Sequence, residues 1–246
     1  MKKVVVLLLL LSTPAIISAQ RTVSRNNLVW FGDFTNAKVA SRWGIYLDFG
    51  FRRTEWLNKW SQLLVRPGIT YNVNEKISAT VGVAYFSHYS SNYIRPEYRG
   101  WQQLLFSETY GRVRWSHRLR TEQRTTQKMI AGKLVDDYSY TNRYRYQVGL
   151  QVALNRPKLA DKTMYVLVAE EIFVNSGKEI RINYFDQNRI SAGIGYKHND
   201  LLNISISYMK DFIQKSQIDA FESNNVLVIN INHNFDFRKK ANKNMN

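Results

Sequence analysis

The chain has 246 residues, no cysteine, and 35 basic against 19 acidic side chains, so its formal net charge is +16. The absence of cysteine excludes a disulfide-stapled scaffold, a thiolate metal site and a cysteine nucleophile. A mean hydropathy of −0.38 is too polar for a helical membrane bundle, but it is compatible with a membrane β-barrel, in which half of each strand faces a polar lumen.

The first nineteen residues have the pattern of a secretory signal peptide. Lys2 and Lys3 form a positive start, Val4–Leu11 is an apolar run, and the small residue Ala19 precedes the expected cleavage point. An uncleaved anchor helix is the alternative, but the apolar run is far shorter than the roughly 20 residues that span a bilayer. The sequence therefore predicts a signal peptide over residues 1–19.

Most of the remaining chain alternates between apolar and polar residues with a period of two, which is typical of β-strands. Arg143–Leu154 shows this best, with Tyr144, Tyr146 and Val148 between polar neighbours. Ten segments, most of them about 10–13 residues long, share the pattern: Trp43–Arg52, Trp60–Tyr71, Ile77–His88, Tyr98–Thr109, Val113–Arg124, Arg143–Leu154, Met164–Val174, Asn188–Tyr196, Leu202–Tyr208 and Val226–Phe237. Soluble strands are usually about 5–6 residues long, whereas a tilted transmembrane strand needs about 9–11.

Two segments fit this pattern less well. Leu28–Phe34 has the character of an eleventh strand, which would break the even count of a bacterial barrel. We assign residues 20–41 to a lead-in segment, residues 42–238 to the barrel and residues 239–246 to a basic periplasmic tail. Pro67 interrupts the segment Trp60–Tyr71, and a β-bulge is expected there because proline cannot donate a hydrogen bond to a strand ladder.

The predicted connections alternate in length. Short links with turn residues cover Asn72–Lys76, Tyr110–Arg112, Asn155–Lys162 and Lys197–Asp200, and longer polar links cover His88–Glu97, Thr125–Asp137, Asn175–Tyr184 and Asp211–Asn225. Outer-membrane barrels have short periplasmic turns and longer surface loops. We expect an all-β fold: a transmembrane antiparallel up-and-down β-barrel of about ten strands, with twelve as the alternative and both chain ends on the periplasmic side. A soluble lipocalin-type barrel is the competing interpretation.

Aromatic residues are expected to form two girdles at the membrane interfaces, because amphipathic rings prefer the headgroup level. The candidates are Trp43, Trp60, Tyr71, Tyr85, Trp101, Tyr144, Tyr196, Tyr208, Phe235 and Phe237. The general preference of aromatic residues for strands would explain how many there are, but not their placement near the strand ends.

Several stretches together resemble a known family. They are Arg66–Tyr71, Tyr98–Gln103, His117–Arg124, Glu171–Asn175 and Phe185–Arg189. In order and spacing they are similar to the bacterial outer-membrane barrel family catalogued as domain of unknown function 2490, over about Asn26 to Phe237. The resemblance implies a single-domain barrel of a Gram-negative outer membrane, and it implies no reaction.

If the apolar side of each strand faces lipid, the other side faces a basic lumen. The inward candidates are Arg52, Arg66, Arg114, Arg118, Arg120, Arg124, Arg143, Arg145 and Arg189. Their expected acidic partners are Asp48, Glu122 and Asp236, with one of Glu170 and Glu171. An excess of arginine attracts anions and binds carboxylate or phosphate in a fork. The pattern therefore predicts passage or binding of small anionic solutes. The alternative is a structural barrel whose interior is filled by a polar plug.

Other activities have weaker support. His88 lies beside Ser87, Ser90 and Ser91, which leaves a surface-facing lipid hydrolase as a further alternative, although no Gly-x-Ser-x-Gly elbow accompanies it. We expect a non-enzymatic protein without a metal or cofactor, because no metal-ligand spacing occurs. The expected partners are outer-membrane lipid and lipopolysaccharide, small anionic solutes, and the barrel-assembly machinery during insertion. Nucleic acid is not expected as a partner.

Overall fold

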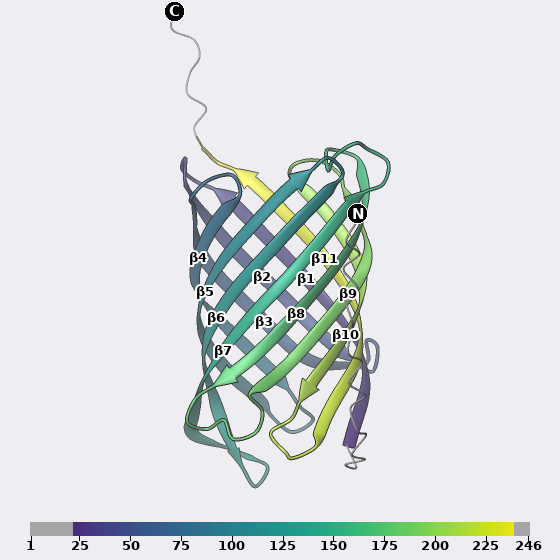
Figure 1. The fold of residues 1–246 in the computed structure, drawn as a ribbon. Helices are drawn as coiled ribbons and strands as arrows, with labels where there is room; N and C mark the ends of the chain where they lie inside the picture. The colour runs from purple at the N-terminus through teal and green to yellow at the C-terminus, as the bar shows by residue number, and fades with distance from the viewer. Residues whose placement is uncertain (1–21, 239–246) are drawn as a thin grey trace, which may run out of the picture.

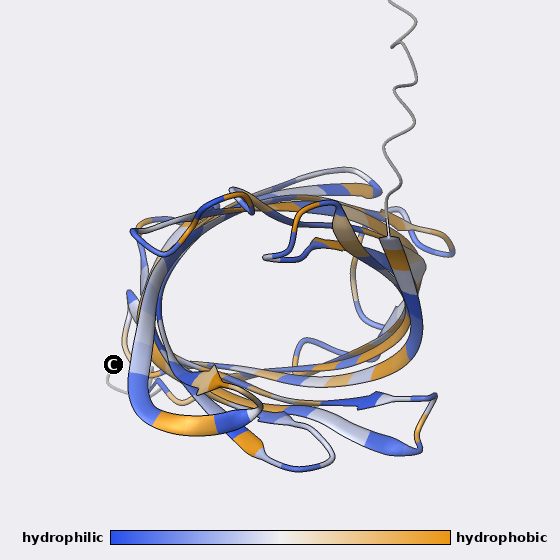
Figure 2. Ribbon diagram, turned by 90° about the horizontal axis from the view of Figure 1, so that it is seen from below, coloured by the Kyte–Doolittle hydropathy of each residue, from blue (hydrophilic) through white to orange (hydrophobic). Residues whose placement is uncertain are grey.

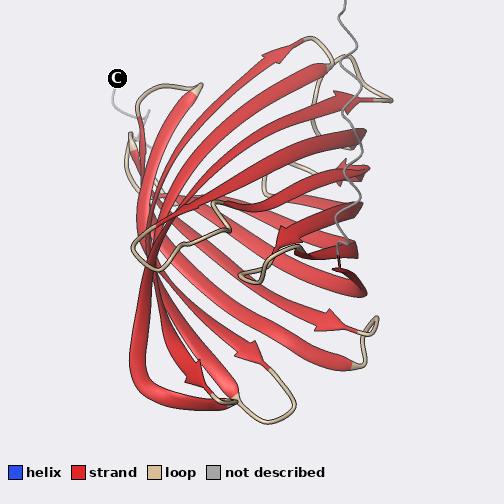
Figure 3. Cartoon of the chain, turned by 60° about the horizontal axis from the view of Figure 1, so that its bottom comes forward, coloured by secondary structure: helices blue, strands red, loops and turns tan. Residues whose placement is uncertain are grey.

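The computed structural model describes residues 22–238, which form strands joined by turns and loops (Figures 1 and 3). The predicted signal peptide and basic tail lie outside the described residues. The strands are β1 (Thr22–Lys38), β2 (Trp43–Thr54), β3 (Lys59–Asn72), β4 (Ile77–Tyr89), β5 (Ile94–Tyr110), β6 (Val113–Ile130), β7 (Lys133–Ala153), β8 (Thr163–Ser176), β9 (Phe185–Lys197), β10 (Leu202–Gln214) and β11 (Ala220–Asp236). Nowhere in residues 22–238 is there a helix with the length and hydropathy needed to cross a membrane.

The strands form one closed barrel in which each strand pairs with its sequence neighbours. The sequence-adjacent pairs are antiparallel, but β1 and β11 close the barrel in parallel (Figure 1). The all-β, mostly antiparallel barrel with sequence neighbours side by side is confirmed. The described residues form eleven strands rather than the predicted ten or twelve, and the closing pair is parallel. Most of the segment assigned as a lead-in, Thr22–Lys38, is a full strand of the wall. With eleven described strands, β1 begins at the rim opposite the end of β11, so the described part of the chain does not start and finish at one rim.

Asparagine pairs accompany the parallel seam. Its register places Asn26 opposite Asn224, Asn27 opposite Asn225 and Asn36 opposite Asn234. In each pair one side-chain amide donates to the other's carbonyl, at 3.0, 3.0 and 3.4 Å respectively. No short turn can join parallel strands, so side-chain pairs help to fix the register here.

The loops are shorter and more even in length than predicted. The polar link at Thr125–Asp137 is mostly strand, because β6 and β7 continue as a hairpin to a two-residue turn at 131–132. Ala131 and Gly132 both have positive φ angles, 49° and 77°, as a tight hairpin turn requires. The link at His88–Glu97 contracts to residues 90–93 in the same way. The longest described loops, 154–162 and 177–184, lie at opposite rims, so the predicted sorting of short and long loops by rim is wrong.

The wall has one face with many exposed apolar residues and one polar face. On β7, Tyr144 and Tyr146 point outward and are 48% and 41% exposed, while Arg143 and Arg145 point inward and are buried. Hydrophobic and hydrophilic residues alternate along the strands in the view down the barrel (Figure 2). This arrangement reverses that of a soluble barrel, which buries its apolar residues inside and exposes polar ones.

Trp101 and Pro67 both differ from their predicted roles in the wall. Trp101 does not join an outer aromatic girdle, because its ring is fully buried inside with Leu64, Ala84 and Phe86. The predicted bulge at Pro67 is also wrong, since β3 keeps its register with both neighbours on either side of the proline. That register places Val83 opposite Pro67, and Trp101 Nε1 donates to the Val83 carbonyl at 3.1 Å. The indole therefore supplies a donor where proline has none.

Gly68 and Gly82 make room for the Trp101 ring, and Gly82 gives a first testable prediction. A Cβ on Gly82 would lie 2.1 Å from the Pro67 carbonyl oxygen and 2.9 Å from the Trp101 ring. Gly82→Ala is therefore expected to lower the free energy of unfolding by about 1–3 kcal/mol, measured by denaturant titration. Gly100→Ala on the adjacent strand is the control, because its Cβ would meet only the movable Gln123 side-chain oxygen, at 3.3 Å. Equal effects of the two substitutions would contradict this account.

Candidate functional site

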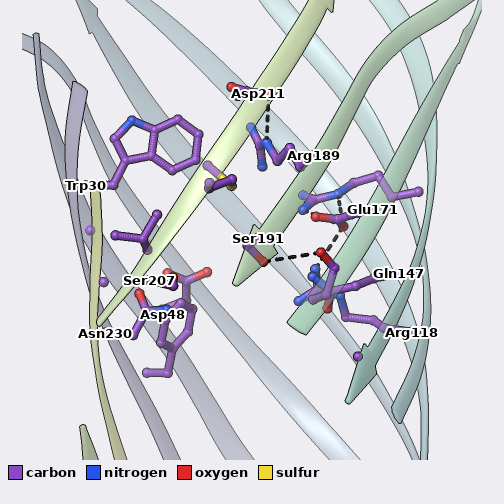
Figure 4. A pocket seen from close by; sticks show the side chains of 18 of the residues that line it. Trp30, Asp48, Arg118, Gln147, Glu171, Arg189, Ser191, Ser207, Asp211 and Asn230 are labelled. Carbon is purple, nitrogen blue, oxygen red and sulfur yellow. Dashed lines mark hydrogen bonds and ion pairs between the residues drawn. The ribbon is translucent and has the colours of Figure 1, made fainter. Parts of the chain in front are cut away.

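A cavity of about 890 Å³ runs through the interior of the barrel. Residues from all eleven described strands line it, and Trp30, Asp48, Gln147 and Arg189 are among those that reach into it (Figure 4). The neutral side chains that line it include the hydroxyls and amides of Ser205, Ser207, Asn203, Asn230, Asn232 and Asn234. The cavity is therefore polar over much of its length, and its charged groups are mostly arginines.

The predicted inward arginines all line this cavity: Arg52, Arg66, Arg114, Arg118, Arg120, Arg124, Arg143, Arg145 and Arg189. They meet there because positions two residues apart on a strand share a face and because adjacent strands pair in register. Arg120, for example, is the register partner of Arg145. Sequence analysis missed a tenth member, Arg99. The alternation Glu97, Arg99, Trp101 on one face of β5 was the signal that could have placed it.

Glu122 is the centre of the ion-pair network. It is 1% exposed and accepts from three guanidinium groups: Arg143 at 2.6 Å, Arg145 at 2.7 Å and Arg99 at 3.1 Å. Its two carboxylate oxygens thus join three strands. A buried carboxylate with this many donors is held in its charged form by both the hydrogen bonds and the charges.

Two further glutamates extend the network across the wall. Glu97, which sequence analysis did not single out, accepts from Arg99 at 2.6 Å and from Arg124 at 2.7 Å. Glu171 accepts from Arg118 and from Arg145, both at 2.8 Å. Glu170 points outward and accepts from Asn188 instead. Arg145 binds both Glu122 and Glu171, so the central part of the network is continuous from β5 to β8.

Of the remaining acidic residues, Asp48 and Asp211 pair with inward arginines, and Asp236 does not. Asp48 pairs with Arg66 at 3.1 Å, and both side chains are buried. Asp211, which the sequence analysis did not predict, accepts from Arg189 at 3.3 Å. Asp236, predicted as a lumen partner, is wrong in that role. It is the last residue of β11, so its side chain lies at the rim rather than in the lumen, and its carboxylate binds Arg238 there.

Arginine guanidinium groups lie over four aromatic rings that face the barrel interior. Arg99 lies 3.6 Å from the centroid of Phe86, Arg52 lies 3.7 Å from that of Trp30, and Arg120 lies 4.9 Å from that of Trp101. Phe173 is completely buried and is flanked by Arg143, Arg145 and Arg189. Cation–π contacts partly replace the hydration that these charges lose inside the barrel.

Some arginines have no carboxylate partner among residues 22–238. Arg120 donates twice to the neutral Gln103 side chain, at 3.0 and 2.6 Å. Arg114 has one long contact with the Ser107 hydroxyl, at 3.4 Å. Arg52 has its contact with Trp30. The network therefore leaves positive charge uncompensated along the cavity, and the free donors are of the type that binds carboxylate or phosphate.

The predicted girdle residues other than Trp101 lie on the outer face. Trp43 and Tyr71 contact each other at 4.9 Å between ring centroids, and Phe235 and Phe237 stack at 5.7 Å. These four and Tyr196 lie at the rim where β11 ends, and Trp60 lies at the opposite rim. Tyr85 packs on Tyr98. Tyr208 sits near the middle of its strand. Tyr144 lies two residues from Asn142, where the pairing of β7 with β8 ends.

The four histidines occupy different surroundings. His88 belongs to β4 rather than to a loop, and its ring contacts Glu97 and Gln62 at 3.0 Å each. Ser87 instead donates to Tyr85, so this serine and His88 do not form a nucleophile–base pair. His117 and His233 point outward, where they contact Tyr146 and Asp33, and His198 lies in the turn after β9. Within the described part of the chain, no group of three or more acidic or histidine side chains is arranged to hold a metal ion.

The fold and the cavity together define a closed β-barrel with an exposed apolar outer surface and an arginine-rich interior. A family model described as protein of unknown function (DUF2490) matches residues 27–222. The chain belongs to this family. Comparison with the curated proteins and with the solved structures finds no match.

Proposed function

We propose that this protein is an outer-membrane β-barrel of a Gram-negative bacterium that takes small anionic solutes into its interior. The observation that carries this proposal is the charge of the cavity. Ten arginines and Lys215 face it, while the carboxylates that line or bind this network are Asp48, Glu97, Glu122, Glu171, Asp186, Asp211 and Glu222. Positive charge in a confined, low-dielectric space concentrates anions.

The membrane location is supported by the wall. Side chains such as Ile69, Val83 and Ile206 are at least 43% exposed to the outside. A soluble protein rarely exposes apolar surface on this scale. The predicted signal peptide agrees with export, and lipid and lipopolysaccharide are the surroundings that such a wall would contact.

Planar-bilayer recordings test the proposal directly. The wild type is expected to conduct with a preference for chloride over potassium, and this preference should weaken at high salt because the Debye length falls from about 10 Å at 0.1 M to about 3 Å at 1 M. Arg114→Glu is expected to reduce the preference with little loss of stability, because Arg114 takes part in no ion pair that the substitution would break.

A neutral control separates charge from steric effects. Arg114→Gln should give a preference between those of the wild type and the Glu variant. Conductance without any preference for anions, or a preference that neither substitution changes, would contradict the proposal.

A structural barrel with a plugged interior is the second candidate, and the continuous network around Glu122 favours it. In that case the wild type would conduct negligibly, since side chains bridged in this way would not move aside for ions. The same recordings therefore distinguish an anion-conducting barrel from a plugged one.

A further inference from the structure

Two arginines from distant strands meet at one tryptophan inside the cavity. Arg52 on β2 lies 3.7 Å from the ring centroid of Trp30, and Arg189 on β9 lies 4.8 Å from it. Trp30 and Arg189 extend into the same space from different parts of the wall (Figure 4). Both guanidinium groups thus face the same indole ring and are near enough for their charges to repel each other, and planar, forked donors of this kind bind carboxylate or phosphate groups.

This pair has too little negative charge around it. No carboxylate of the described residues lies within ion-pair distance of Arg52, and the charges that act on it most strongly include three arginines, Arg189, Arg99 and Arg66, beside the acid Asp211. Asp211 is already engaged, because it accepts from both Arg189 and Gln187. The indole nitrogen of Trp30 is also buried without a hydrogen-bond partner. Unused donors and repelling charges at one place are both relieved by a bound anion.

The surface beside the pair is apolar, unlike most of the cavity. Leu28, Met209 and Val226 form a buried cluster against which Trp30 and Val228 pack. All of these except Val226 line the cavity. A hydrocarbon group placed here would cover the parts of Trp30 and Val228 that remain exposed to the cavity, which is favourable in proportion to the area covered.

We propose that this corner is a binding site for an organic anion that carries an apolar group. The anionic head lies on Arg52 and Arg189, and the hydrocarbon part lies on Trp30, Met209 and Leu28. The site rests on the proposed function in one respect, which is that the cavity admits small anions. It deepens that function by naming the class of solute: amphiphilic anions such as aromatic or short aliphatic carboxylates, rather than inorganic ions or neutral sugars.

Calorimetric titration of the purified full-length protein in a non-ionic detergent tests the site with benzoate as the probe. Acetate supplies the head without the apolar group, and benzyl alcohol supplies the ring without the charge. Benzoate is expected to bind at least tenfold more tightly than either. Arg52→Gln is expected to weaken benzoate binding about tenfold or more, which is the loss of one charge-assisted contact.

Matched variants keep the result interpretable. Arg52→Gln breaks no ion pair, so the unfolding temperature of the free protein should stay unchanged or rise. Arg112→Gln removes the same charge in the turn between β5 and β6, where the guanidinium contacts the Leu154 carbonyl, and it should leave benzoate binding unchanged. Trp30→Phe should keep the apolar surface but weaken the hold on the Arg52 stack, giving an intermediate affinity.

The outcomes separate this site from the general function. Benzoate binding that is unchanged by Arg52→Gln would overturn the site even if the bilayer recordings show anion preference. Acetate binding as tightly as benzoate would overturn the apolar component. Benzoate binding that depends on Arg52 in a barrel that does not conduct would support the site while removing passage from the proposed function.

Discussion

Replacing Glu122 by glutamine is expected to lower the free energy of unfolding by about 3–5 kcal/mol, the usual cost of removing one partner from a buried ion pair. The substitution keeps the size of the side chain, which is 1% exposed, but it leaves Arg143, Arg145 and Arg99 without their shared counter-charge. The amide also turns two donors toward guanidinium groups that have only donors to offer. Denaturant titration of the refolded protein in detergent measures the change.

Glu170→Gln is the matched control for this substitution. Glu170 precedes Glu171 on β8 but points outward, where it accepts from Asn188 at 3.0 Å. Its replacement should change the free energy of unfolding by about 1 kcal/mol or less, as is usual for an exposed polar contact. Similar losses for both substitutions would show that the interior network contributes little to stability.

Replacing Ile206 by arginine is expected to destabilise the barrel by about 2–4 kcal/mol in lipid vesicles, the cost of an arginine on the lipid face near the middle of a bilayer. Ile206 is 43% exposed, and its register partners on either side are Ile194 and Ile229. It therefore lies at the centre of an apolar patch with no adjacent charge to pair with the new guanidinium. Unfolding by denaturant in vesicles gives the measurement.

Tyr138→Arg provides the control for depth. Tyr138 is 40% exposed on the part of the β6–β7 hairpin that extends beyond the last pairing of β7 with β8, at Asn142 and Ser176. If the barrel spans a bilayer, this position lies outside the hydrocarbon, and the same substitution should cost about 0–1 kcal/mol. Equal costs at the two positions would show that no bilayer surrounds Ile206, and the membrane proposal would then fail.

The wall of the barrel could be predicted from the sequence because alternation is a local signal. Residues such as Tyr144 and Arg145 differ so strongly in polarity that their faces follow from the period alone. Closure was harder to predict. Thr22–Lys38 alternates weakly, with Asn26, Asn27 and Asn36 on both faces, and an expectation of an even strand count removed it from the wall. Its partner, β11, lies about 200 residues away in the chain, and no local pattern specifies such a pairing.

The site shows a similar division. The side to which each predicted arginine points follows from its position in a strand. The ion-pair partner of each arginine does not follow from its position in the strand, because ion pairs such as Arg118 with Glu171 join strands that are not adjacent in the barrel. Polar stretches such as Thr125–Ile130 were assigned to a loop because they lack an apolar face, yet a strand that continues into water needs no such face. The difference between Asp236 and Asp211 also depends on where a strand ends, which is the least certain feature of any sequence-based assignment.

The parallel seam has a consequence for the sidedness of the chain. A barrel with an even number of strands returns the polypeptide to the side from which it started, whereas here Thr22 and Asp236 emerge at opposite rims. In a membrane, the two rims face different compartments. An epitope inserted just before Thr22 would then be accessible from one side only, and one placed just after Asp236 from the other. If the barrel spans a bilayer, the described chain therefore starts on one side of it and ends on the other, whereas a barrel closed by an antiparallel pair starts and ends on the same side.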